Sequence, residues 1–156
     1  MRTSAALSFR QLALEIENTN QARLQKADTA GRIAFYVQHG RELLDQGLSG
    51  EAAKQFQQAV VLDPMNAGAH AGLARALESN KDTAGARKEA QASLRMAPSA
   101  EAYLVLARLD LTDNNTAGAQ QNVDRALALD PANASAVTLK HDIAARGAGG
   151  SKPPQP

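Results

Sequence analysis

Three prolines divide the middle of the chain into nearly equal intervals. Pro64, Pro98 and Pro131 lie 34 and 33 residues apart, and each follows an alanine-rich amphipathic stretch. Because proline lacks a backbone N–H and its ring clashes with the preceding helical turn, each one predicts the end of a helix. A constant interval of this length indicates a repeat protein, in which every repeat is one supersecondary unit.

Alignment on the prolines gives three units, 33–66, 67–99 and 100–133, and each contains two helical patterns separated by a short polar break. A residue that tolerates left-handed geometry, followed by a helix N-cap, is expected at each break. The pairs are Gly47 with Ser49, Asn80 with Asp82, and Asn114 with Thr116.

Small residues recur at two fixed distances before each proline, where closely packed helices need them. Twelve residues before the prolines stand Ala52, Ala86 and Ala119, and five residues before them stand Ala59, Ser93 and Ala126.

In these features the chain resembles the tetratricopeptide repeat family over 33–133. The signature positions of the family are occupied in the first unit by Tyr36, Gly40, Leu43, Ala52, Phe56, Ala59 and Pro64, in the second by Leu73, Ala74, Leu77, Ala86 and Pro98, and in the third by Tyr103, Leu106, Ala107, Ala119, Ala126 and Pro131. Three residues depart from the pattern: His39 and Asp110 replace large apolar residues, and Ala90 stands where the first unit has Phe56.

The resemblance implies an all-α fold, a right-handed superhelical α-solenoid of about three helix-turn-helix repeats with an N-terminal helix and a C-terminal capping helix. Repeats gain a core only by stacking, and the last one needs a polar cap. Residues 134–146, N-capped by Asn133, are expected to form that cap, and 147–156 are expected to be a flexible tail.

Residues 1–32 are expected to contain an amphipathic helix, because Phe9, Leu12, Ala13 and Ile16 follow helical spacing. Three interpretations stay open. The helix is a degenerate half-repeat, it packs on the first repeat, or it docks on another chain and supports a homo-oligomer.

Charge and composition argue against several function classes. Seventeen basic and sixteen acidic residues leave a net charge of +1, so the chain has no strong field for nucleic acid. It has no cysteine, no apolar run long enough to insert in a membrane, and no pair of its three histidines at ligand spacing. We therefore expect no catalytic residue, no metal and no cofactor, and, without a targeting signal, a cytoplasmic location.

The family binds peptides in a concave groove lined by the first helix of each repeat. The ninth position of the three units holds Arg41, Arg75 and Arg108, and Val37, Leu44, Leu104 and Leu111 are expected beside them. A row of guanidinium groups would suit the carboxylates of an acidic peptide. Alternatively, Asp45, Glu78 and Glu101 neutralise the row, with Arg41–Asp45 and Arg75–Glu78 as pairs within one helix.

The carboxylate clamp, with which some family members hold chaperone tails, is not expected in this chain. Its positions correspond to Val37, Arg41, Gly72, Glu101 and Val105, and only one of these is basic. The sequence thus predicts a non-catalytic module that binds a protein or peptide segment in its groove, and the arginine row favours an acidic one. The alternative is an assembly module that acts through the N-terminal helix or the convex face.

Overall fold

The computed structural model describes residues 9–149, except for the side chains at positions 9, 10, 13, 148 and 149. The described residues form eight helices and no strand. The helices are α1 (Phe9–Lys26), α2 (Thr29–Asp45), α3 (Ser49–Leu62), α4 (Ala67–Ser79), α5 (Thr83–Met96), α6 (Ala100–Thr112), α7 (Thr116–Leu129) and α8 (Ala134–Gly149).

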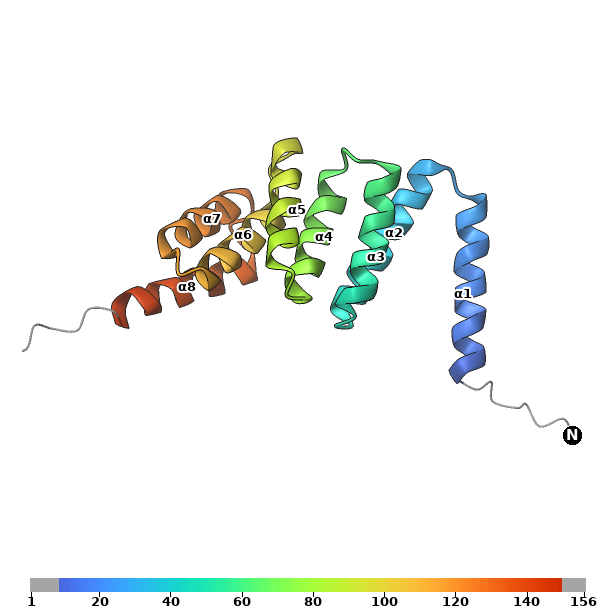
Figure 1. Cartoon of the computed structure of the whole chain (residues 1–156), viewed down its shortest axis with the longest axis horizontal. Helices are drawn as coiled ribbons and strands as arrows, with labels where there is room; N and C mark the ends of the chain where they lie inside the picture. Colours follow the sequence, from blue (N-terminus) through green and yellow to red (C-terminus); the bar gives the residue numbers. More distant parts are fainter. Residues whose placement is uncertain (1–8, 150–156) are drawn as a thin grey trace, which may run out of the picture.

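The three units each fold into a pair of helices, and the pairs stack into a solenoid (Figure 1). The pairs are α2 with α3, α4 with α5, and α6 with α7, and the closest packing in the molecule is within them. The predicted all-α helical-repeat fold is confirmed. We keep 33–66, 67–99 and 100–133 as proposed repeat boundaries, although α2 begins earlier, at Thr29, where Asp28 caps it by accepting a hydrogen bond from Gly31 N at 2.7 Å.

The second helix of each pair ends just before its proline, as predicted. The C-cap residues Asp63, Ala97 and Asp130 are extended, with φ of −142°, −155° and −141°. An extended residue before proline avoids the clash with the proline ring, so the helix cannot continue.

The turns inside the pairs differ from the prediction by one residue. The left-handed residues are Gly47, Lys81 and Asn114, with φ of 77°, 66° and 60°. The N-caps follow them at Leu48, Asp82 and Asn115, so Asn80, Ser49 and Thr116 were wrongly assigned. Asp82 and Asn115 cap their helices because their side chains accept hydrogen bonds from the N–H groups of Gly85 and Gly118. Leu48 makes no such side-chain bond.

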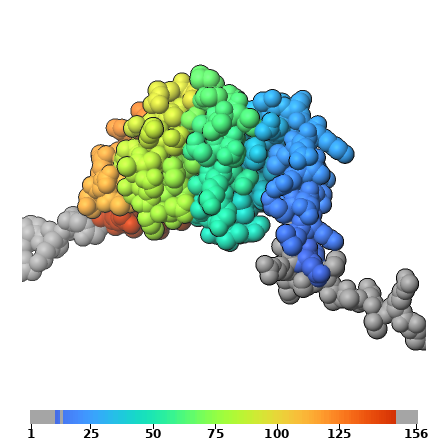
Figure 2. All heavy atoms as spheres, turned by 45° about the vertical axis from the view of Figure 1, so that its right-hand side comes forward, coloured from blue at the N-terminus to red at the C-terminus, as the bar shows by residue number. Residues whose placement is uncertain are grey.

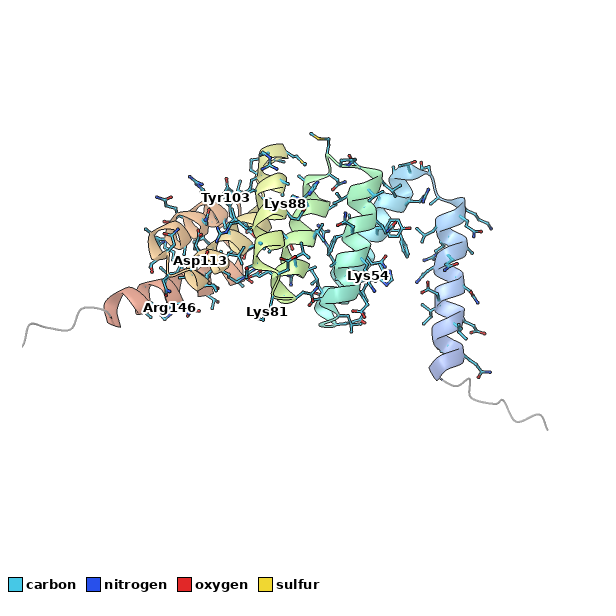
Figure 3. The ribbon with its side chains drawn as sticks, viewed as in Figure 1. Lys54, Lys81, Lys88, Tyr103, Asp113 and Arg146 are labelled. Atoms are coloured by element: carbon cyan, nitrogen blue, oxygen red, sulfur yellow. The ribbon has the colours of Figure 1, made fainter. Side chains whose placement is uncertain are left out.

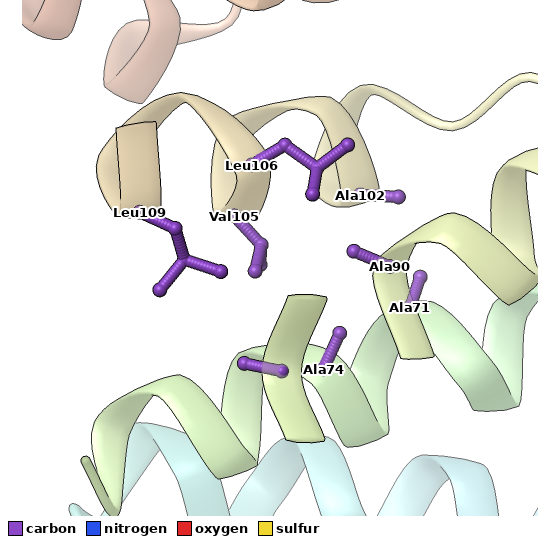
Figure 4. Packing of buried hydrophobic residues seen from close by; sticks show 8 residues of the cluster. Ala71, Ala74, Ala90, Ala102, Val105, Leu106 and Leu109 are labelled. Atoms are coloured by element: carbon purple, nitrogen blue, oxygen red, sulfur yellow. The ribbon is translucent and has the colours of Figure 1, made fainter. Parts of the chain in front are cut away.

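The core depends on alanines that let the helices approach closely. All six predicted small positions are completely buried: Ala52, Ala59, Ala86, Ala119 and Ala126 have no exposed surface, and neither does Ser93, whose hydroxyl donates to Ala67 O at 2.9 Å. Figure 4 shows the same packing between the second and third repeats.

At one core position, the large side chain comes from the second helix in the first repeat and from the first helix of the following repeat at the next interface. Phe56 is completely buried, and its ring lies against Gly40 and Gly72, where a Cβ would be 2.8 Å and 2.2 Å from the ring. In the next repeat the small Ala90 packs in one cluster with Val105, which occupies the position equivalent to Gly72 (Figure 4). The departure at Ala90 is therefore compensated by Val105.

Asp110, a second departure, lies in a polar network inside the stack. It is 7% exposed, accepts a hydrogen bond from Arg87 Nη1 at 3.0 Å and another from Asn122 Nδ2 at 2.9 Å. Arg87 also donates to Asp113 at 2.8 Å. The network joins α5, α6 and α7, so Asp110 links the second and third repeats through polar contacts instead of apolar ones.

The two ends of the stack differ. α8 packs on α7 and closes the core with Ala136 and Ile143, and it continues to Gly149, so the predicted tail does not begin at 147. Glycine costs a helix only about 1 kcal/mol, which does not stop a helix that is already formed. At the other end, α1 stands apart from the body beyond its junction with α2 (Figures 1 and 2).

Candidate peptide-binding face

The inner side of the curved stack is formed by the first helix of each repeat. α4 packs on both α2 and α6, whereas no comparable packing joins α3 to α5 or α5 to α7. The first helices are therefore closer together than the second helices, which makes their side the concave one. Two of the second helices carry an exposed lysine each, Lys54 on α3 and Lys88 on α5 (Figure 3).

One surface hollow, of about 390 Å³, lies beside α1, and a larger one, of about 570 Å³, lies on this inner face. It is bounded by α2, by the connection from α3 to α4 and by the start of α4. The residues lining it are Ala30, Ile33, Ala34, Val37, Gln38, Arg41, Asp63, Asn66 and Gly68. We call it the Arg41 hollow.

Among the described residues, Arg41 is the only basic one that lines the Arg41 hollow, and it is exposed. It forms no ion pair with any residue that the structure describes, and the pair with Asp45 considered above does not form. Asp63, across the hollow, accepts a hydrogen bond from Met65 N at 3.0 Å. Asn66 accepts the hydrogen bond that caps α4 with its Oδ1, so its amide N–H groups can donate to a ligand.

Arg75 and Arg108 are paired with acids of the neighbouring repeat. Arg108 binds Glu78 through Nε and Nη2, both at 2.6 Å, and this fork-to-carboxylate geometry is the strong form of such a pair. Arg75 Nη1 lies 3.6 Å from Glu101 Oε1 and keeps 44% of its side chain exposed. Both pairs join α4 to α6, so the partners are on adjacent helices and not on one helix.

The four predicted apolar residues face the core more than the groove. Leu104 is 6% exposed and packs with Ala126 and Ala136. Leu111 is half-buried against Val123 and Ile143. Val37 and Leu44 are half-buried beside Phe56, and of the four only Val37 lines the Arg41 hollow.

Sequence reasoning missed Ile33, Asp63 and Asn66. Asp63 and Asn66 lie in the connection after α3, which helical periodicity does not address. Their position next to Pro64 could have identified them, because the chain passes there from the end of α3 to the start of α4, beside α2.

The smaller hollow, of about 390 Å³, lies between α1 and the first repeat. Its floor consists of Phe35, Tyr36 and His39, with ring centroids 5.8 Å and 5.4 Å from Phe35 to the other two. Glu17, Asn20, Gln21, Leu24 and Gln25 of α1 form one wall, and Gln55 and Gln58 of α3 form the other. We call it the α1 cleft.

The three histidines have separate surroundings. His70 is 8% exposed and lies between two acceptors, Glu89 Oε2 at 2.6 Å from Nδ1 and Pro64 O at 3.0 Å from Nε2. Its role is thus to join α4 to α5 and to the preceding connection. Within 9–149, no cluster of three or more His, Asp or Glu side chains could hold a metal ion, and no helix is long and apolar enough to cross a membrane.

The comparison with known proteins gives one family and one fold. Residues 37–101 match the tetratricopeptide repeat family model. No curated protein matches the chain.

Solved structures of low sequence identity share the fold. The second TPR domain of human RPAP3, in complex with the HSP70 peptide SGPTIEEVD, is 19% identical with a TM-score of 0.64, covering 75% of this chain and 98% of that one. The Arabidopsis OM64 TPR domain is 16% identical with a TM-score of 0.69, over 76% and 99%. MamA is 16% identical with a TM-score of 0.67, over 92% and 86%.

The repeat interval, the stacked helix pairs, the family model and the shared fold all agree. Residues 37–101 therefore match the tetratricopeptide repeat family, and the described residues share the fold of TPR domains.

Proposed function

We propose that this chain is a non-catalytic protein-interaction module that binds an extended peptide on its inner face, centred on the Arg41 hollow. The observation that carries the proposal is the exposed guanidinium of Arg41, which forms no ion pair with any described residue, at the edge of a hollow of about 570 Å³ beside the half-buried Val37. The other two groove arginines are already engaged by Glu101 and Glu78.

The chemistry of the hollow favours a peptide with an acidic group close to an apolar side chain. A carboxylate can take both N–H donors of the Arg41 guanidinium, and the apolar group can cover Ile33 and Val37. The amide of Asn66 can donate to a peptide carbonyl. Because the hollow is preformed, the protein loses little entropy on binding.

The structural relatives support peptide binding as a use of this fold, since one of them holds an HSP70 peptide that ends in acidic residues. This chain has Val37, Gly72 and Glu101 where the carboxylate clamp has polar or basic residues. We therefore propose an acidic ligand gripped mainly by Arg41, and not a chaperone tail held by the clamp.

Fluorescence anisotropy with two labelled peptides tests the proposal. One peptide alternates glutamate and leucine, and the other carries lysine in place of each glutamate. We expect the acidic peptide to bind more tightly, and its affinity to fall with salt, because exposed charges are screened over about 8 Å at physiological ionic strength. Equal affinities for the two peptides at low and high salt would contradict the proposal.

Arg41→Glu locates the site. The substitution should weaken binding of the acidic peptide on the order of tenfold or more, since it replaces an attraction by a repulsion. Arg95→Glu, on an exposed position in the last turn of α5, is the matched control and should leave the affinity within about twofold. An equal loss in both variants would indicate a general charge effect and no site.

A further inference from the structure

The N-terminal half of α1 presents an apolar stripe that no other described element covers. Leu12 and Ile16 are 46% and 57% exposed, and they lie one turn apart on the same side of the helix. Asn20 and Leu24 continue this side into the α1 cleft. A helix gains most of its stability from packing its amphipathic face, so this half of α1 lacks the contacts that a stable helix uses.

The α1 cleft also contains a polar atom without a partner. Nδ1 of His39 is buried and makes no hydrogen bond with any described residue. The cleft and the stripe together form one trough along α1.

The charges of α1 fit a second copy of the same helix. Glu15 and Lys26 are eleven residues apart, which is about 20° beyond three full turns, so both lie on the same flank of the stripe. In an antiparallel pair related by a two-fold axis, like flanks face each other, and residue i meets residue j twice. Glu15 of each copy would thus face Lys26 of the other.

We propose that α1 pairs antiparallel with α1 of a second copy, so that the chain forms a weak two-fold dimer. Leu12 and Ile16 of each copy enter the α1 cleft of the other, beside Leu24 and Phe35. A helix of 18 residues is about 27 Å long, so the interface is smaller than a standard one and the affinity is micromolar. The dimer uses a different surface from the Arg41 hollow.

Sedimentation velocity from about 1 to 300 µM tests the pairing, and we expect a concentration-dependent dimer. Leu12→Glu with Ile16→Glu should leave a monomer at every concentration. Leu14→Glu is the matched control, because Leu14 is 57% exposed and lies about 160° from both residues. It should leave the dimer unchanged, and equal far-UV circular dichroism shows that all variants are folded.

Charge reversal tests the antiparallel order. Glu15→Lys and Lys26→Glu should each weaken the dimer on the order of tenfold, since each places like charges opposite at two symmetric positions. The double variant Glu15→Lys/Lys26→Glu should restore wild-type affinity, because both pairs form again with the charges exchanged.

Three results would overturn the proposal: a wild-type chain that stays monomeric up to 300 µM, a dimer that survives the stripe substitutions, or a double reversal that is weaker than either single one. Arg41→Glu should leave the dimer unchanged. Failure of the dimer therefore does not affect the proposed peptide binding, and failure of peptide binding does not affect the dimer.

Discussion

Gly72 is predicted to be the position where one added methyl group destabilises the stack most clearly. A Cβ there would lie 2.2 Å from Cε1 of Phe56 and 2.6 Å from Cδ1 and Cζ. The Phe56 ring has little room to move, because Gly40 also lies against it and the Phe56 side chain is completely buried.

The net effect of Gly72→Ala follows from two opposing contributions. Alanine favours the helix by about 1 kcal/mol over glycine. Overpacking a buried site costs about 1 to 3 kcal/mol, and more where nothing can move. We expect a net loss of about 2 kcal/mol, which is roughly 6 °C in Tm for a domain of this size.

Thermal and urea unfolding followed by circular dichroism measure this loss. Gly68→Ala is the control in the same helix, since a Cβ there meets only Asn66 Oδ1 at 3.5 Å, and it should be neutral or stabilising. The double variant Phe56→Ala/Gly72→Val copies the pair Ala90 and Val105 and should be more stable than Phe56→Ala alone. If Gly72→Ala were as stable as wild type, the close contact assigned between Phe56 and Gly72 would be wrong.

Three further predictions concern a cap, a buried network and a surface ion pair. Leu48→Asp should stabilise the chain by about 1 kcal/mol in urea unfolding, because the φ and ψ of Leu48 (−89°, 63°) are close to those of the capped Asp82 (−83°, 79°); no gain would mean that the side chain cannot reach the α3 N–H groups. Arg87→Met should cost about 1 to 3 kcal/mol by leaving the buried Asp110 carboxylate without its cation, whereas a loss no larger than that of Lys88→Met would exclude the network as a stabilising element. A hydrogen bond from Lys140 at 2.8 Å, together with one from Gln120, holds the pKa of Asp124 below its ordinary value. The pair therefore adds stability at a pH above the pKa of Asp124 in the unfolded chain, and this stability is lost as the pH falls through the lower pKa of the folded chain. Because the pair is exposed, Asp124→Asn should lower the unfolding midpoint slightly at pH 7 and not at pH 2, and an equal effect at both pH values would contradict this assignment.

The repeat architecture could be predicted because its signals are local. A proline ends the helix that precedes it. A site of close helix packing is recognised by the alanine that recurs there, at Ala52, Ala86 and Ala119, without reference to the rest of the chain. Two of the three N-caps were predicted one residue too late, because Ser49 and Thr116 have capping chemistry but the residues before them take the N-cap position, whereas Asp82 was predicted correctly.

The candidate site could be predicted only in part, because charge pairing depends on which helices are adjacent. Arg108 and Glu78 are 30 residues apart in sequence, yet stacking places them in bidentate contact. Periodicity within one helix cannot reveal that pair. The sequence therefore suggested a row of three available arginines, whereas in residues 9–149 only Arg41 of the three has no acidic partner. The separation of α1 from the body was equally inaccessible, since it depends on few contacts.

The location of a bound acidic peptide tests the central claim most directly. In a titration of the ¹⁵N-labelled chain with the alternating glutamate and leucine peptide, we predict that amide chemical-shift changes gather at Ile33, Val37, Arg41 and Asn66 and disappear in Arg41→Glu. Changes confined to α3, α5 and α7, or the same pattern in wild type and Arg41→Glu, would contradict the account.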